Sequence, residues 1–251
     1  MNYIIWFYSL LGFLIGSFLN VCIDRLPLKE SILTPPSHCP KCQRRLTPLE
    51  LIPVFSFLFL RGRCKDCGEK IPPRILLVEV GTGIFFFLIW HRFGFSWNTL
   101  LISIYCCLLI IIAGIDLEHH KVLNILIFPA IVLVLIMIPI LHSADFWSYL
   151  GGAGLGFGVL FLIALLAPGA MGMGDVKLVV FLGLAVGFPE IIIVLFLAFV
   201  LGGLVAGILL ALKKLGPKDQ VAFAPYLALG GLITLLYGTQ LIDLWVRSLG
   251  G

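Results

Sequence analysis

Two aspartates lie at the ends of long apolar runs, where burial of an ionisable side chain costs free energy and is usually found only at functional sites. Asp116 ends the third of several long apolar runs, and Asp175 opens the sixth, directly after Gly172 and Gly174. An ionisable side chain next to hydrocarbon marks a functional site by default. Two carboxyl groups in contact can share one proton, so that one serves as a base while the other donates. Such a pair can activate water to attack a peptide carbonyl without a metal ion or a covalent nucleophile.

Asp175 also has a plain structural interpretation, in which a glycine-rich loop ends at this aspartate as the N-cap of the next helix. Lys177 follows, and its long side chain can reach the lipid headgroups. His119 and His120 come after Asp116 and are expected in a hydrated loop. What favours catalysis by Asp175 is the second aspartate, expected on the same side of the membrane.

Four cysteines form two CxxC pairs separated by 21 residues: Cys39, Cys42, Cys64 and Cys67. Two thiolates at this spacing lie on one tight turn, and two such turns can close a tetrahedron around zinc. Gly68 follows the second pair, where such a turn often needs a positive φ. Four protein ligands leave no open coordination position, so we expect a structural metal. Four free thiols, or a redox-active pair, remain the alternative.

The composition places most of the chain in a membrane. Of the 251 residues, 61% are hydrophobic and 12% are charged, whereas soluble domains carry about 25% charged residues. The sequence therefore predicts an all-α integral membrane protein with about eight transmembrane helices. The expected spans, each an apolar run, are 3–23, 75–91, 98–115, 122–141, 148–167, 177–189, 190–212 and 223–244.

The basic residues indicate how these helices are oriented. Ten of the seventeen Lys and Arg residues lie in the polar segment 24–74, and basic residues gather on the cytoplasmic side. The segment is therefore expected in the cytoplasm, with Asp116 and Asp175 at the cytoplasmic membrane boundary. We expect three parts: a first transmembrane helix at 1–23, a zinc-binding segment at 24–74, and a polytopic membrane peptidase domain at 75–251.

The ordered set of motifs resembles the type IV prepilin peptidases, a family of bacterial leader peptidases, along nearly the whole chain. Residues 16–27 read GSFLNVCIDRLP, which is similar to the N-terminal signature of the family, and the paired CxxC motifs follow it. Arg74 and the LVE sequence at 77–79 resemble the entry to the second span. Residues 115–120, IDLEHH, resemble the first catalytic motif, and residues 172–178, GMGDVKL, resemble the second.

This resemblance implies an aspartic endopeptidase that cuts the leader peptides of type IV prepilins or pseudopilins just after a glycine, at the cytoplasmic face of the bacterial inner membrane. Asp116 and Asp175 would be its catalytic pair, with support from Gly172, Gly174 and Lys177. The four paired cysteines would hold zinc. The expected partners are pilin-like substrates and the lipid bilayer, and no nucleic acid.

Many bacterial members of the family also methylate the new N-terminus with S-adenosylmethionine, and the resemblance links this activity to the N-terminal half. Arg74 and Glu79 are the candidate residues there. Glu79 lies about one turn inside the second span, where an unpaired carboxylate is costly. Arg74 lies five residues earlier, slightly far for an ideal helical pair. A structural ion pair and a role toward the cofactor both remain open.

Three positions depart from the family pattern. The chain has Leu-Asn at 123–124 where many members have Pro-Asp, Ala-Phe-Ala-Pro at 222–225 where many have Pro-Phe-Gly-Pro, and Ile-Leu at 75–76 where many have Tyr-Pro. The first can change the start of a helix, and the second can change the packing behind the active site. The third bears on the methyltransferase half of the chain.

Two other functions fit parts of the sequence. A GxGD intramembrane protease of the presenilin or signal-peptide-peptidase type shares the aspartates but not the CxxC pairs or the N-terminal signature. A membrane transporter with buried acids would hold them near the membrane midplane, whereas Asp116 and Asp175 stand at the ends of spans. Cleavage of a pilin-like precursor distinguishes these alternatives, and also a catalytically inactive homologue.

Overall fold

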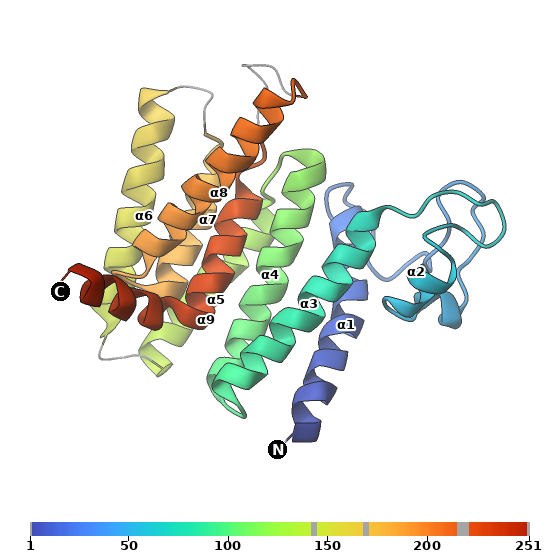
Figure 1. The fold of residues 1–251 in the computed structure, drawn as a ribbon, viewed down its shortest axis with the longest axis horizontal. Helices are drawn as coiled ribbons and strands as arrows, with labels where there is room; N and C mark the ends of the chain where they lie inside the picture. The colour runs from blue at the N-terminus through green and yellow to red at the C-terminus, as the bar shows by residue number, and fades with distance from the viewer. Residues whose placement is uncertain (1, 142–144, 168–170, 215–220, 250–251) are drawn as a thin grey trace. The chain divides into compact units, whose positions relative to one another are not determined.

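Helices make up nearly all of the regular structure in the computed structural model, which describes residues 2–141, 145–167, 171–214 and 221–249 (Figure 1). The chain forms two compact units, Met1–Ile115 and Asp116–Gly251, here called the N-terminal and the C-terminal unit. Within the described residues, each of the eight apolar runs corresponds to a long helix: α1 (Asn2–Arg25), α3 (Pro73–Phe93), α4 (Trp97–His119), α5 (Asn124–Leu141), α6 (Phe146–Leu166), α7 (Met173–Val186), α8 (Ile191–Ala211) and α9 (Ala224–Leu249).

Seven of these helices are long and apolar enough to cross a membrane, and α7 is the exception. Its 14 residues extend about 21 Å, whereas the hydrocarbon core of a bilayer is about 30 Å thick. The helix packs against α5, α6 and α9 and buries more than half of its side chains. A helix enclosed by protein does not have to match the bilayer thickness. The predicted all-α membrane fold is confirmed, with α7 as the short member of the expected eight.

In the N-terminal unit, glycines let α1 and α3 pack with their backbones close together. A Cβ at Gly12 would lie 2.7 Å from the Cβ of Phe86, and a Cβ at Gly16 would lie 2.8 Å from the Cα of Glu79. Small residues allow this approach at many interfaces between membrane helices. The start of the signature at 16–27 is therefore a packing surface for α3.

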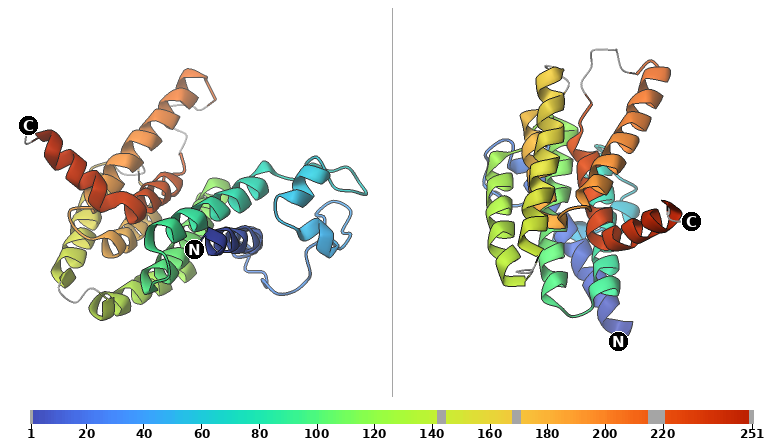
Figure 2. Two further views of the ribbon diagram at one scale, coloured as in Figure 1. Left: turned by 60° about the horizontal axis from the view of Figure 1, so that its bottom comes forward. Right: turned by 90° about the vertical axis from the view of Figure 1, so that its left-hand side faces the viewer.

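The polar segment between α1 and α3 forms a lobe at the end of the pair where α1 finishes and α3 begins (Figures 1 and 2). It contains a short 3-10 helix, η1 (Pro48–Leu51), and a five-residue helix, α2 (Phe55–Phe59). Neither is predictable from the sequence, because such short elements carry no helical periodicity. The lobe, defined here as residues 26–72, holds the four paired cysteines.

In the C-terminal unit, α7 lies against α6 at a second set of glycines. A Cβ at Gly183 would lie 2.5 Å from the carbonyl oxygen of Gly152, and a Cβ at Gly152 would lie 2.6 Å from the carbonyl carbon of Gly187. The backbone N–H of Phe188 donates to the carbonyl of Ser148 at 3.1 Å. These contacts hold the C-terminal end of α7, and its N-terminal end carries the GxGD motif.

Candidate active site and metal centre

Asp175 lies in the first turn of α7, with 9% of its surface exposed. The helix begins at Met173 with Gly172 as its N-cap, so the interpretation of Asp175 as an N-cap is wrong. Its carboxylate accepts a hydrogen bond from the backbone N–H of Gly172, as an acidic third residue does in a capping box. The positive end of the helix dipole also favours a negative charge here. Asp175 is therefore oriented by the terminus of its own helix.

Gly174 allows the connection between α4 and α5 to touch the start of α7. A Cβ at Gly174 would lie 2.8 Å from the Cβ of Val122, which is closer than two side chains tolerate, so glycine is required for this approach. Val122 belongs to the chain that follows Asp116. The contact therefore brings the residue before Asp175 against the turn that follows the other aspartate.

Asp116 lies near the C-terminal end of α4 and is buried, with 6% of its surface exposed. Its Oδ2 accepts a hydrogen bond of 3.2 Å from the backbone N–H of Ala224. Ala224 is the first residue of α9, where backbone N–H groups have no partner within the helix. Sequence reasoning misses this donor, because the two residues are 108 positions apart. A glycine at position 224 would offer the same N–H, so the departure from the family pattern leaves the contact intact.

The two aspartates lie close enough for the charge of Asp116 to act on Asp175. Their positions in the sequence predict only that both lie on one side of the membrane. In the structure both are buried, and the approach of Gly174 to Val122 brings the turns that carry them together. Two buried carboxyl groups within electrostatic reach repel each other when both are ionised, which favours a state in which only one of them is ionised. His120, at the end of α4, is exposed.

Lys177 connects α7 to α5. Its Nζ donates a 2.9 Å hydrogen bond to Oδ1 of Asn124 and lies 5.5 Å from the centre of the Phe128 ring, within the range of a cation–π contact. An aspartate at position 124, as in many members of the family that the chain resembles, would form an ion pair here. Asn124 keeps the hydrogen bond without the charge.

The four paired cysteines converge in one cluster in the N-terminal unit. Their Sγ atoms all lie within 4.8 Å of one another, and those of Cys39 and Cys67 are 3.7 Å apart. Zinc held by four thiolates at about 2.3 Å has sulfur–sulfur separations of about 3.8 Å. The predicted convergence is confirmed, and the cluster has the dimensions and the soft donors that suit a metal such as zinc.

Each CxxC pair sits in a turn of the same design. Gln43 and Gly68, which follow the second cysteine of each pair, have φ angles of 59° and 68°. Their backbone N–H groups donate to the carbonyl oxygens of Cys39 and Cys64, and an isolated β-bridge closes each turn. Backbone N–H groups of the second turn point at the sulfur of Cys64 and lower the pKa of its thiol to about 6. The turn therefore favours the thiolate form of Cys64, the form that binds metals.

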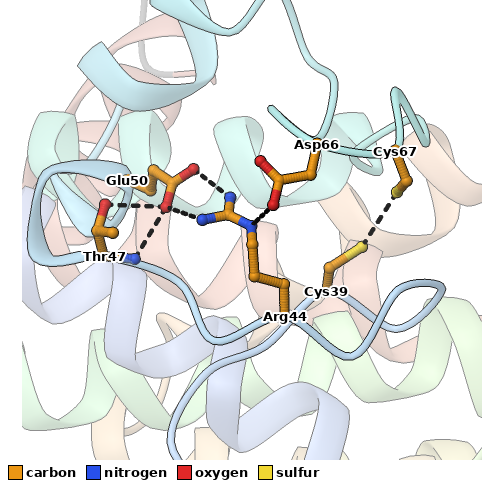
Figure 3. A network of polar contacts seen from close by, with 6 residues as sticks. All are labelled: Cys39, Arg44, Thr47, Glu50, Asp66 and Cys67. Carbon is orange, nitrogen blue, oxygen red and sulfur yellow. Dashed lines mark hydrogen bonds and ion pairs between the residues drawn. The ribbon is translucent and has the colours of Figure 1, made fainter.

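Arg44 joins the two turns, as Figure 3 shows. Its guanidinium makes a bidentate interaction with the Glu50 carboxylate, in which Nη2 donates to Oε1 at 2.5 Å and Nη1 donates to Oε2 at 3.2 Å. Its Nε lies 2.7 Å from a carboxylate oxygen of Asp66. The guanidinium holds the pKa of Glu50 at about 2, far below the usual value of about 4.3. The sequence does not reveal this network, because which base meets which acid depends on how the two turns face each other.

Arg74 and Glu79 have different partners. Arg74 forms an ion pair of 2.5 Å with Asp24 at the end of α1. Glu79 is 4% exposed and accepts a 2.7 Å hydrogen bond from the backbone N–H of Val54 and another from the hydroxyl of Ser17. Val54 has a φ of 65°, which is rare for a β-branched residue. The Glu79 carboxylate therefore ties α3 to a strained point of the lobe.

Comparison with known proteins finds matching families over both halves of the chain. The model of the bacterial peptidase A24 N-terminal domain matches residues 10–93, and that of the type IV leader peptidase family matches residues 103–208. The prepilin leader peptidase/N-methyltransferase of Bacillus subtilis (strain 168) is 35% identical over 241 residues, which are 94% of this chain and 95% of that protein. The proteins of the same name from Stutzerimonas stutzeri and Pseudomonas aeruginosa are each 31% identical, over 92% and 96% of this chain and 90% and 93% of their own length. No solved structure matches.

Proposed function

Because this chain belongs to the type IV leader peptidase family, we propose that it cleaves the leader peptides of type IV prepilins or pseudopilins and then methylates the new N-terminus. Cleavage is assigned to the C-terminal unit, with Asp116 and Asp175 as the catalytic pair and Gly172, Gly174 and Lys177 as residues that position them. Methylation is assigned to the N-terminal unit.

The observations that support the peptidase proposal are that Asp116 and Asp175 are both buried, that each is held by a backbone N–H, and that the charge of Asp116 reaches Asp175. One carboxylate takes a proton from a water molecule while the protonated partner donates to the oxygen of the scissile carbonyl. The water oxygen bonds to the carbonyl carbon, and the tetrahedral intermediate then breaks its C–N bond. The departing nitrogen takes up the proton that the first carboxylate removed from water. As the carbonyl re-forms, a hydroxyl group of the intermediate returns its proton to the second carboxylate, so the pair again holds one proton.

The chain is a multi-pass bacterial membrane protein, and we place it in the inner membrane with the aspartates at the cytoplasmic face. The support is the concentration of basic residues in the lobe and its borders. Lys65 and Lys70 are exposed on the lobe. A membrane-impermeant amine reagent should therefore modify them in inside-out vesicles and not in intact cells, and the opposite pattern contradicts this orientation.

Zinc is the proposed metal of the cysteine cluster, and its proposed role is structural. Four thiolates complete a tetrahedral coordination sphere, so no position is left for water or substrate. S-adenosylmethionine supplies the methyl group of the second reaction when it is bound. The lobe and the ends of α1 and α3 provide the surface on which that cofactor and the new N-terminus can meet.

Neither alternative function gains support. The matched relatives over nearly the whole chain are prepilin leader peptidases, not proteases of the presenilin type or transporters. A transporter would also have its acids near the membrane midplane, whereas Asp116 and Asp175 lie near the ends of α4 and α7.

Incubation of the detergent-purified protein with a pilin-like precursor tests both activities, with product masses measured in the presence and absence of S-adenosylmethionine. We expect a product shortened to a residue that follows a glycine, and a further gain of one methyl group when the cofactor is present. A precursor that stays intact contradicts the peptidase proposal. A shortened product that never gains a methyl group contradicts only the methyltransferase proposal.

A further inference from the structure

Six large apolar side chains are exposed on one part of the lobe, although the lobe is otherwise polar. Their exposed fractions run from 42% to 84%. They lie in η1, in α2 and between the two, and η1 packs against α2. We call them the apolar patch: Leu49, Leu51, Ile52, Phe55, Leu58 and Phe59. A contiguous exposed group of this kind marks an interaction site.

The short helix α2 has an apolar face that is turned away from the protein. Phe55, Leu58 and Phe59 are spaced three and four residues from the first of them, so they share one side of the helix. The opposite side faces inward, because Phe57 and Leu60 line a cavity between the lobe and the ends of α1 and α3. The exposed side of α2 is therefore held in a fixed direction.

A hydrogen bond sets the position of α2 along the membrane helices. Val54 is the N-cap of α2, and its backbone N–H donates to Glu79 at 2.7 Å. Glu79 lies in the second turn of α3, about 9 Å along the helix from Pro73, its first residue. The 21 residues of α3 extend about 32 Å, little more than the hydrocarbon core of about 30 Å.

The start of α2 is therefore level with a turn that lies inside the membrane-spanning part of α3. In Figure 1, α2 lies on the side of the lobe that points back along α1 toward its N-terminus. Amphipathic segments that lie on a bilayer bury their apolar face about 5–10 Å into the boundary between headgroups and acyl chains. The apolar patch stands at this depth.

Basic side chains flank the apolar patch in the sequence. Arg61 and Arg63 follow α2, and Arg45 precedes η1 by three residues. All three are exposed, and none of the ion pairs found among the described residues includes them. An arginine at a membrane surface can lay its alkyl chain on apolar groups while its guanidinium reaches the phosphates. Anionic lipid complements both the patch and its arginines.

We propose that the segment 45–63 docks the lobe onto the bilayer that α1 and α3 span, with the apolar patch in the acyl-chain boundary and its arginines on anionic lipid headgroups. The lobe is then held on the membrane at three points, which are α1, α3 and the patch. This inference does not depend on the proposed function. A second copy of the chain fits the patch less well, because pairing two patches would bring two sets of arginines together.

Photolabelling of the wild-type full chain in lipid nanodiscs tests the docking directly. The nanodiscs contain phosphatidylglycerol and phosphatidylcholine with a trace of lipid that carries a diazirine on its acyl chain, and the labelled peptides are mapped by mass spectrometry. We expect label in residues 49–59 and little in the exposed polar turn at 40–43 of the same lobe. Label in 49–59 that is no higher than in this turn overturns the proposal.

The triple variant Phe55→Ser, Leu58→Ser and Phe59→Ser removes the apolar face of α2. Because these side chains are exposed, the lobe should keep its fold and its metal content, while label in 49–59 should fall about tenfold or more. Leu33→Ser is the matched control, since Leu33 is 81% exposed outside the patch, and it should leave this label unchanged. Undiminished label in a triple variant with normal metal content overturns the role of the patch.

Lipid charge is tested in nanodiscs of phosphatidylcholine alone. Label in 49–59 should fall severalfold there, while label in α1 should stay the same because α1 spans either bilayer. Equal label of 49–59 in the two bilayers contradicts the role of the arginines. Cross-links between the patches of two copies, without lipid label, would overturn the proposal in favour of self-association.

Discussion

Asp116 and Asp175 each depend on a backbone N–H at the start of a helix. Ala224, at the start of α9, serves Asp116, and Gly172, at the start of α7, serves Asp175. Helix N-termini present such groups because their first N–H bonds have no partner inside the helix. Two carboxyl groups held in this way are fixed in position while both remain able to exchange a proton.

Gly174→Ala tests the approach of the two aspartate-bearing turns. The added methyl group would meet Val122 at 2.8 Å, and overpacking of this kind typically costs about 1–3 kcal/mol. Because catalysis is sensitive to displacements of about 1 Å, we expect the cleavage rate to fall about tenfold to a hundredfold. The measurements are the cleavage rate and the melting temperature of the purified variant.

Gly158→Ala is the control for this substitution. A Cβ at Gly158 would meet nothing within 4 Å, and alanine is the better helix former. The control should keep both the cleavage rate and the melting temperature of the wild type. Normal cleavage by Gly174→Ala would mean that the close approach does not position Asp175.

At the scale of the elements, the apolar runs predict the helices well because each run is long, but they predict the helix ends poorly. The run at 177–189 corresponds to Met173–Val186, since the polar GxGD residues form the first turn of α7 and not a loop. Hydropathy cannot identify a buried polar turn of this kind. The last span, predicted at 223–244, continues as helix to Leu249.

The lobe shows how much of a site can be predicted from the spacing of residues in the sequence. CxxC spacing predicts the cysteine cluster, because each pair fixes a local turn. The partners of Arg74 and Glu79 are not local: Asp24 lies at the end of α1, and Val54 lies in the lobe. The five-residue spacing of Arg74 and Glu79 leaves the partner of Arg74 open, and the structure supplies Asp24 as a partner in a structural ion pair.

Removal of the metal tests the structural role of the cluster. We expect about one zinc ion per chain by elemental analysis, and its loss in the double variant Cys39→Ser with Cys64→Ser. Structural zinc contributes folding free energy directly, on the order of 10 kcal/mol in zinc-finger peptides, so the lobe should become sensitive to protease when the metal is chelated.

Cys107→Ser is the matched control, since this cysteine lies in α4 outside the cluster. It should keep both the zinc and the resistance of the lobe to protease. A metal-free wild type whose lobe stays as resistant as before would show that the metal has no structural role.

At the scale of the whole molecule, the candidate activities fall into different compact units. The division after Ile115 lies close to the start of the second matched region at 103–208. The cysteine cluster belongs to the N-terminal unit, and both aspartates belong to the C-terminal unit. The division into parts at 1–23, 24–74 and 75–251 stays a prediction.

Glu79→Gln should therefore separate the two activities. Glu79 contributes to the N-terminal unit, so the variant should methylate cleaved pilin about tenfold more slowly or worse while it keeps most of its cleavage rate. Mass spectrometry of the product scores shortened and methylated species separately. If a folded Glu79→Gln protein loses cleavage together with methylation, the N-terminal unit must help to build the peptidase site.

The central claim is that Asp116 and Asp175 act as one catalytic pair, and cleavage by their asparagine variants tests it most directly. Asp116→Asn, Asp175→Asn and the double variant are incubated with a pilin-like precursor, and the shortened product is quantified by mass spectrometry. Each asparagine keeps the shape of the side chain but cannot exchange the proton, and loss of acid–base catalysis costs about 10²–10⁴-fold in rate. Because groups that act as a unit give non-additive losses, all three variants should fall to the same background. Robust cleavage by either single variant, or a double variant much slower than both singles, would contradict the pair.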